Sequence, residues 1–340
     1  MIEVKGKGSV ARILKDSISP QGNRLTTMEI EVSRIVWAEF LTHGMLCRNA
    51  HSSRAIPFDK MVANLNGKPV RFGQANPGMQ DKGTDYEALI EGDIVLAGAD
   101  ARWAYGPEEA WELAKEDAIK WSQRFHQAGY HKQVYNRITE PYQTIKAVVS
   151  ATEWDNYYWL RDDVAADPTL EDLTRTMRQA HEESTPQVLK AGEWHLPYVK
   201  TARNPHGKLC YLIEPDQEGG EWDEMNLDEA IKVSSARTGA VSFRAVDYGL
   251  EQCLRVYEKL VGDERKHASA MQHQATPMQA KQGMPMSICG RVNQAFSPDT
   301  WQNGISHADR EGNLWSAQFK GWIMNRKLIP GENYHAPTRP

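Results

Sequence analysis

The strongest periodic pattern of apolar and polar residues lies in the middle of the chain and predicts a long helix. Its apolar positions recur at alternating spacings of three and four residues, which places them on one face of a helix. Pro107 suits the first helical turn, and Gly129 suits the position just past the last turn. We expect this apolar stripe to pack in the core; its members are Trp111, Ala114, Ala118, Trp121 and Phe125.

Two more helices are predicted further along the chain. Asp167 followed by Pro168 forms an N-cap and a first-turn proline, so a helix should begin there. Another helix is expected over residues 250–261, where apolar residues recur at helical spacing, and Gly262 should end it.

Strand signals are fewer and lie in two places. Met28, Ile30 and Val32 alternate with other residues, so we expect a strand over residues 27–36, followed by a short helical stretch. A second strand is expected near residues 240–243. This mixture favours an α+β fold in which a small, mainly antiparallel sheet packs against several helices.

The chain is long enough for one large core or two modest ones, and we expect a single domain over residues 1–340. Two segments, residues 191–228 and 278–306, contain several glycines and prolines and show no clear period. Such segments are typical of loops. The sequence therefore predicts one domain with two irregular inserted segments.

Composition and charge argue against several broad classes of protein. The net charge is -5 and the pI is about 6.1, which disfavours binding to DNA, RNA or a membrane surface through a basic face. No run approaches the roughly 18 apolar residues of a membrane span, and residues 1–7 do not resemble a signal peptide. The four cysteines form no C-x-x-C pair, so we expect reduced thiols and a cytoplasmic protein.

The most informative segment is residues 42–54, which read T-H-G-M-L-C-R-N-A-H-S-S-R. Its guanidinium, amide, imidazole and hydroxyl groups can all donate to the oxygens of an anion, and arginine does so as a two-pronged fork. The segment follows the predicted N-terminal strand, and binding loops are common at such junctions. An ordinary solvated turn is the alternative. The segment therefore suggests an anion-binding loop.

Residues 42–54 also resemble, without a gap, the signature R-H-R-x-x-S-x-N-E-x-S-x-R of the flavin-dependent thymidylate synthases. The matching positions are His43, Asn49, Ser52 and Arg54. The family's R, R, S and E are replaced by Thr42, Gly44, Cys47 and Ala50. The value of this partial match depends on whether the family's other blocks are present.

Three further blocks of that family can be found in an altered order. Residues 108–141 resemble its helix and the G-x-x-x-x-x-x-R-x-x-x-P block that follows. Residues 154–161 resemble its N-x-x-x-x-R helix. The family's opening block, A-R-V-S-F followed by a helix and H-x-S/T-x-x-E-H, resembles residues 240–243 and 267–273. The four blocks together cover most of the chain.

We interpret the altered order as a circular permutation, with blocks near residues 27–57, 107–183 and 235–277. Such rearrangements are tolerated where the chain ends lie close together at exposed sites. In the family, the block that ends at the position of His273 leads directly into the strand before the signature. We therefore expect His273 to lie beside the strand that contains Thr27.

The resemblance implies one catalytic domain that methylates dUMP to dTMP with FAD, using methylenetetrahydrofolate for the carbon and NADPH as reductant. Enzymes of this family pass a hydride from reduced flavin, so the protein supplies placement and charge stabilisation. The family also implies a homo-oligomer, most often a tetramer, with sites between subunits. Two alternatives stay open: synthesis of another modified pyrimidine nucleotide, such as a hydroxymethylated one, and a non-catalytic homologue that binds a nucleotide or a partner.

The resemblance also assigns roles to individual residues. Arg161 would stabilise negative charge on the uracil ring. The nucleotide would be held by Ser52, Ser53, Arg54 and Arg137. The flavin would be held by His43, Asn49, Asn156, His267, Ser269 and Gln272. Without the resemblance, a surface ion pair is the more ordinary interpretation of Arg161, for example with Asp162.

Several departures from the family remove charge from the expected sites. Two arginines are missing at positions 42 and 44, and two glutamates at positions 50 and 272. Arg48 or His51 could compensate. Cys47 is either a reactive thiol or a small packing residue, and the family's serine favours packing. No metal is expected, because His267 and His273 lack the spacing of paired ligands on a helix.

Overall fold

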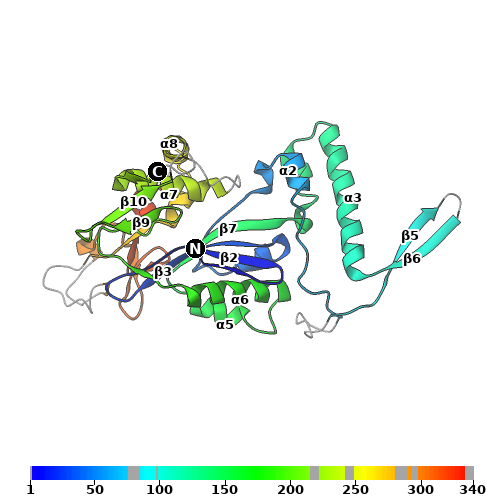
Figure 1. Cartoon of the computed structure of the whole chain (residues 1–340), viewed down its shortest axis with the longest axis horizontal. Coiled ribbons are helices and arrows are strands. Elements are labelled where there is room, and N and C mark those ends of the chain that lie inside the picture. The colour runs from blue at the N-terminus through cyan, green and yellow to red at the C-terminus, as the bar shows by residue number, and fades with distance from the viewer. Residues whose placement is uncertain are drawn as a thin grey trace, which may run out of the picture.

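The computed structural model describes residues 2–75, 85–96, 99–214, 222–241, 249–279, 290–291 and 298–333. The chain has an α+β fold, as the sequence predicts, built around one central sheet (Figure 1). Hydrogen-bonded neighbours follow the order β1-β2-β3-β7-β4 and are antiparallel. The bounds of these strands are β1 (Glu3–Lys5), β2 (Ser9–Ile18), β3 (Arg24–Ser33), β4 (Cys47–Ala50) and β7 (Thr144–Ala151). A short strand, β8 (Gln187–Val188), pairs parallel with β2.

The first face of the sheet is covered by two helices, α5 (Asp155–Arg161) and α6 (Pro168–Glu183), which lie side by side beneath it in Figure 1. Met28, Ile30 and Val32 of β3 point into this core, as their alternation predicts. Helix α6 begins where expected, because the Asp167 carboxylate accepts hydrogen bonds from the backbone N–H groups of the first turn.

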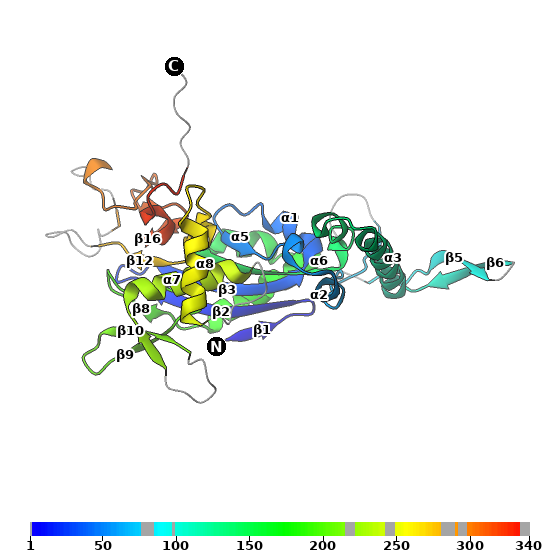
Figure 2. The same cartoon turned by 90° about the horizontal axis from the view of Figure 1, so that it is seen from above.

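The second face of the sheet is partly covered by a separate core. Helices α7 (Leu227–Ala240) and α8 (Leu250–Val261) pack there with a small antiparallel sheet and the C-terminal strands (Figure 2). The small sheet consists of β9 (Lys200–Arg203), β10 (Leu209–Ile213) and β11 (Asp223–Met225). The C-terminal strands are β12 (Ala275–Pro277), β13 (His307–Ala308), β14 (Leu314–Ser316), β15 (Phe319–Lys320) and β16 (Trp322–Met324).

Helix α3 (Pro107–Gln127) forms where the periodicity predicts it, but its apolar stripe is not a core stripe. Trp121 is 55% exposed, and Ser122 is the helix's one buried residue among those described. The reason is the position of α3 beyond the end of the central sheet, next to the two-stranded hairpin β5 (Ile90–Leu96) and β6 (Ala99–Tyr105) (Figures 1 and 2). The prediction that this stripe packs in the core was therefore wrong.

Short helical segments link these parts of the fold. The first strand prediction was too long, because β3 ends at Ser33 and the chain then turns through 3-10 helix before α1. The α-helical segments are α1 (Trp37–Phe40), α2 (Phe58–Val62) and α4 (Lys132–Tyr135). The 3-10 segments are η1 (Arg34–Val36), η2 (Ser53–Ala55), η3 (Glu140–Tyr142), η5 (Ala268–Gln272), η7 (Pro298–Thr300) and η8 (Asn325–Leu328).

Two other local predictions need correction. The strand expected near residues 240–243 is not formed at its start, because Ala240 ends helix α7, whereas Ser242 and Phe243 lie outside the described residues. The segment 191–228 is not simply irregular, because it contains the three strands of the small sheet. Most of the other expected irregular segment, 278–306, lies outside the described residues. Within the part of the chain that is described, no helix is long and apolar enough to cross a membrane.

A fully buried chain of hydrogen bonds crosses the second face of the sheet. His195 contacts Thr27 Oγ1 through Nε2 at 2.8 Å and Ser17 Oγ through Nδ1 at 2.9 Å. Thr27 Oγ1 lies 2.6 Å from Ser150 Oγ, which lies 2.8 Å from His273 Nδ1. Thr27 and His273 therefore both contact Ser150, so His273 lies beside the strand that contains Thr27, as expected.

Burial keeps the imidazoles of His195 and His273 neutral. It lowers the pKa of His273 to about 3 and holds the pKa of His195 well below its ordinary value, with the Lys15 charge adding to the effect on His195. An unfolded chain would protonate them near pH 6.5. Below that pH the unfolded state binds more protons than the folded state, so the fold loses stability as the pH falls.

We predict that His273→Gln reduces the acid sensitivity of the fold. Each buried neutral histidine lowers the free energy of unfolding by about 1.4 kcal/mol per pH unit below pH 6.5, down to its folded pKa. Urea unfolding measured between pH 6 and pH 4.5 should therefore show a shallower pH dependence in the variant, by about one proton. Parallel curves for the variant and the natural protein would show that His273 is not buried as a neutral imidazole.

Candidate functional site

The segment 42–54 is not a plain loop, because its centre forms β4, which pairs with β7 at the edge of the central sheet. Side chains of a strand alternate between its two faces. Asn49 Nδ2 donates to Thr238 O of α7 at 2.9 Å, on the second face. Arg48 Nη1 instead donates to His43 O, on the first face. The strand therefore divides the predicted site residues between two sides of the sheet.

On the second face, five of the predicted residues line one open hollow of about 490 Å³, here called the motif hollow. They come from the signature segment and from the segment before β12, which are more than 200 positions apart in the chain. These five are Asn49, Ser52, Arg54, His267 and Ser269. The structure thus brings together two of the blocks on which the resemblance rests.

The walls of the motif hollow are fixed by direct contacts. Gln272 Nε2 donates to Arg48 O at 2.7 Å, which fastens η5 to β4. A Cβ atom at Gly239 would lie 3.2 Å from Leu260 Cδ1 and 3.4 Å from Ala270 Cβ. Glycine at this position therefore lets α7 approach both α8 and η5 closely. The hydrogen bond of Gln272 holds η5 against β4.

The chemistry of the motif hollow favours an anion. Arg54, His267 and Ser269 are exposed, and none of the three has a side-chain hydrogen bond or ion pair within the described ranges. The residues lining the hollow include no aspartate or glutamate. Donors without a carboxylate attract negatively charged groups, and arginine is suited to phosphate.

Two lining residues, His131 and Gln133, were not predicted. They belong to α4 and its N-cap, where His131 Nδ1 accepts a hydrogen bond from the Gln133 backbone N–H at 3.2 Å. Both stand between Gly129 and Arg137 in the block that resembles the family. Their polar side chains were the one signal in the sequence that could have indicated a binding role. They stand at positions where the family motif allows any residue, so the motif did not select them.

On the first face, Arg161 and His43 contact each other directly. Arg161 Nε donates to His43 Nε2 at 2.9 Å, which requires an unprotonated Nε2. The His43 ring also meets the edge of Tyr157 at a centroid distance of 4.9 Å. Burial lowers the pKa of His43, and the charges of Arg161 and Arg48 lower it further, so the imidazole is held neutral.

The alternative ion pair between Arg161 and Asp162 is not formed. Asp162 is instead bound by Arg175 at 2.8 Å and by Arg178 at 3.0 Å, both on α6. The guanidinium of Arg161 therefore meets an imidazole and no carboxylate among the described contacts. A guanidinium in that setting keeps its positive charge available for another anion.

The other predicted residues lie elsewhere. Arg137 is exposed and lines a different hollow of about 560 Å³ with Arg34 and Trp37. Ser53 is buried and donates to Glu140 Oε1 at 2.5 Å, so its hydroxyl supports the fold. Asn156 is exposed on α5. Within one chain, these residues do not join the motif hollow.

The thiol of Cys47 is buried, which raises its pKa to about 12, so it remains protonated and packs as a small side chain. His51 is also buried, and its Nδ1 accepts from the Lys146 backbone N–H at 2.8 Å. It therefore does not supply charge to the motif hollow. In the described part of the chain, no group of three or more His, Cys, Asp and Glu side chains is arranged to hold a metal ion.

Comparison with known proteins adds no assignment: no family model matches the sequence, and the search of curated proteins finds no match.

We predict that Arg161→Gln raises the pKa of His43. The substitution removes a positive charge and a donor to Nε2, both of which favour the neutral ring, while burial remains and keeps the pKa below its ordinary value. Titration of the ring protons by NMR measures the shift. Arg48→Gln is the matched comparison and should give a smaller rise, because the Arg48 charge has the smaller effect. An unchanged His43 titration in Arg161→Gln would contradict the contact.

Proposed function

We propose that the protein binds a pyrimidine nucleotide with its phosphate in the motif hollow and methylates dUMP to dTMP. FAD would be the cofactor, methylenetetrahydrofolate the carbon donor and NADPH the reductant, in the cytoplasm. The observation that carries the proposal is the meeting of Asn49, Ser52, Arg54, His267 and Ser269 around one hollow without a carboxylate. Its volume of about 490 Å³ is within the range of small-molecule sites.

Phosphate binding is the best supported step. Arg54 lines the hollow with a charged fork, and Ser52 lies two residues before it, shortly after β4 ends at Ala50. The hydroxyl of Ser52 can donate to a second phosphate oxygen. Both groups follow closely after β4, which pairs with β7 as far as Ala50, so the phosphate would be held next to the edge of the sheet.

Arg161, which would act on the base, lies on the first face, and Arg137, which would also hold the nucleotide, lines another hollow. Arg161 and Arg137 do not line the motif hollow, and exposed apolar side chains surround Arg161, among them Trp159 at 77% and Leu160 at 44%. Large apolar side chains exposed together often mark a protein interface. We therefore propose that a second copy completes the site in a homo-oligomer, with its Arg161 facing the nucleotide held by Arg54.

The flavin would be held by groups whose hydrogen-bonding capacity is not used within the described chain. His267 and Ser269 at the motif hollow are exposed and carry such side chains, as does Asn156, which would come from the second copy. Such groups fit the polar edge of a flavin ring. The flavin would supply the hydride when bound. Gly44, where the family has arginine, faces open space with no atom within 4 Å of an added Cβ. The cofactor would therefore be held more by hydrogen bonds than by ion pairs.

In this arrangement, the task of Arg161 is electrostatic. A guanidinium that meets a neutral imidazole is oriented by it and keeps its full positive charge. A fixed charge of this kind stabilises negative charge that develops on a bound uracil ring. His43 would therefore position Arg161 through the hydrogen bond to Nε.

Product analysis tests the proposal as a whole. The full-length protein, incubated with FAD, NADPH, methylenetetrahydrofolate and dUMP, should form dTMP and show a perturbed flavin spectrum. A hydroxymethylated product from dUMP or dCMP would instead support modified-pyrimidine synthesis. Absence of any product together with an unperturbed flavin spectrum would leave only a non-catalytic nucleotide-binding protein.

We predict that Arg54→Ala weakens dUMP binding at least about tenfold, because a charge-assisted hydrogen bond contributes roughly 1.5–3 kcal/mol. Titration calorimetry measures the change. Arg255→Ala is the matched control, since this arginine of α8 is 70% exposed, lines neither hollow and should leave the affinity unchanged. Equal affinity of both variants for dUMP would remove the motif hollow as the phosphate site.

A further inference from the structure

A second cavity, of about 540 Å³, lies between the central sheet and the small sheet, and none of the residues assigned above lines it. We call it the sheet pocket. Its floor is formed by Arg12, Leu14 and Glu29, which point from β2 and β3 toward the second face. Its walls come from the loop before β9, from the small sheet and from α7. The pocket is therefore separate from the motif hollow.

The backbone is strained at Tyr198, in the wall of this pocket. Tyr198 has φ of 61°, a left-handed conformation that is rare for an aromatic residue and costs on the order of 1–3 kcal/mol. Two contacts hold it there. Arg237 Nη1 donates to Tyr198 O at 2.9 Å, and the Tyr198 hydroxyl donates to Glu29 Oε2 at 2.8 Å. Strain kept by surrounding contacts is typical of binding sites.

The charge balance of the pocket favours an anion. Three cations line the pocket, Arg12, Lys200 and Arg237, together with two carboxylates, the buried Glu29 and the exposed Glu214. Glu29 already accepts from Tyr198, from Arg12 at 3.0 Å and from Lys146 at 3.3 Å. Arg12 pairs with Glu3 as well as Glu29, and only its Nη2 has no hydrogen-bond partner among the residues that the structure describes. Lys200 has no carboxylate partner there and lies over the Trp222 ring. The lining thus carries one more positive than negative charge, and Lys200 together with one nitrogen of Arg12 can meet an anion.

The walls also offer apolar and aromatic surface. Lys200 Nζ lies 4.1 Å from the centroid of the Trp222 ring, and Trp222 is 38% exposed. Leu14, Val199 and Leu212 complete the apolar lining. Pockets with aromatic walls and a few convergent charges are typical of small-molecule sites.

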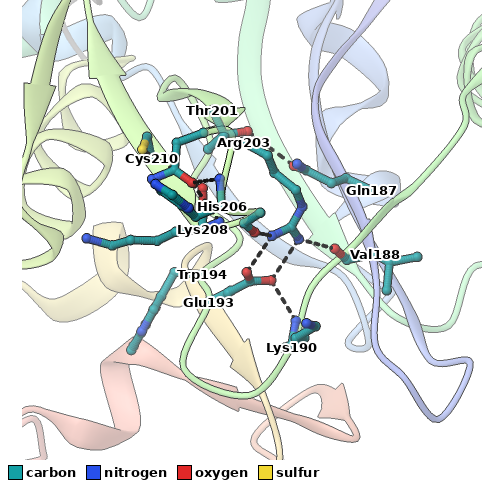
Figure 3. A network of polar contacts seen from close by, with 12 residues as sticks. Gln187, Val188, Lys190, Glu193, Trp194, Thr201, Arg203, His206, Lys208 and Cys210 are labelled. Carbon is teal, nitrogen blue, oxygen red and sulfur yellow. Dashed lines mark hydrogen bonds and ion pairs between the residues drawn. The ribbon is translucent and has the colours of Figure 1, made fainter.

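The small sheet that carries these walls is fixed to the body (Figure 3). Arg203 of β9 binds both carboxylate oxygens of Glu193, at 2.7 and 2.9 Å, and donates to Val188 O of β8 at 3.0 Å. Thr201 Oγ1 donates to Gln187 Oε1 at 3.1 Å. A two-pronged arginine contact restricts movement in two directions. The pocket is therefore preformed.

We propose that the sheet pocket binds a small molecule that carries a planar aromatic ring and an anionic group. The ring would lie against Trp222 and the apolar lining, and the anion would meet Arg12 and Lys200. This site is independent of the nucleotide and flavin sites proposed above. A carboxylate and a phosphate share the required chemistry.

Binding is tested with three probes that have the same ring: 2-naphthoate, 2-naphthyl phosphate and the neutral 2-naphthylmethanol. The titrations use the full chain with Arg54→Ala, so that the motif hollow does not capture the phosphate probe. At least one anion should bind about tenfold or more tightly than the alcohol, and the tighter anion identifies the anionic group. Equal affinity for all three probes, or no binding by either anion at about 5 mM, would overturn the proposal.

Two variants with matched controls locate the probe. Lys200→Gln should weaken the anions at least about fivefold and leave the alcohol unchanged, whereas Trp222→Leu should weaken all three probes. The controls are Lys208→Gln, an exposed lysine between β9 and β10, and Trp121→Leu, whose ring also lies under a cation, Arg124, at 4.6 Å. Equal effects of the controls and the pocket variants would place the probe elsewhere and overturn the assignment.

Discussion

The buried hydrogen bonds through Thr27 and Ser150 are the interaction on which the second face of the sheet depends. Thr27 of β3 and Ser150 of β7 contact each other across two neighbouring strands, and each also binds a histidine. All four side chains are completely buried. A buried polar group without a hydrogen-bond partner destabilises the fold. Only segments that supply these partners, such as those carrying His195 and His273, can therefore lie above the sheet at this point.

Both cavities are placed by the two ends of this hydrogen-bond chain. His195 fixes the segment that leads three residues later to the strained Tyr198 and then to Lys200, which form a wall of the sheet pocket. His273 follows directly after η5, whose Ser269 lines the motif hollow. One buried network therefore positions an anion-attracting hollow at the sheet edge and a second pocket near its middle.

The edge position of β4 has a functional consequence. Because its side chains alternate, Asn49 faces α7 and the motif hollow, whereas Arg48 turns toward His43 and Arg161. A single chain cannot bring both groups to one ligand without a rearrangement of the sheet. We propose that association of two copies solves this problem without a change in either fold. Such an association would also cover the exposed apolar side chains near Arg161.

Local signals in the sequence determined much of the secondary structure. Asp167 and Pro168 defined the start of α6, and the apolar spacing over residues 250–261 defined α8, because capping and periodicity act within one or two turns. The motif letters similarly selected Ser52, Arg54, His267 and Ser269, which do meet around one hollow. These predictions needed only neighbouring residues or a known motif.

Long-range packing decided the rest. The stripe on α3 has the period of a core helix, yet only part of it is covered: Trp111 packs against Tyr142, whereas Trp121 is exposed because α3 lies beyond the end of the central sheet (Figure 1). Ser53 and Gln272 carry the expected functional groups, but these groups already donate hydrogen bonds within the fold, to Glu140 and to Arg48 O. The sheet pocket combines residues from β2, β3, α7 and the small sheet. The sequence by itself determined the local elements and the polar residues available, whereas only the tertiary structure decided which of those groups remain free to bind a ligand.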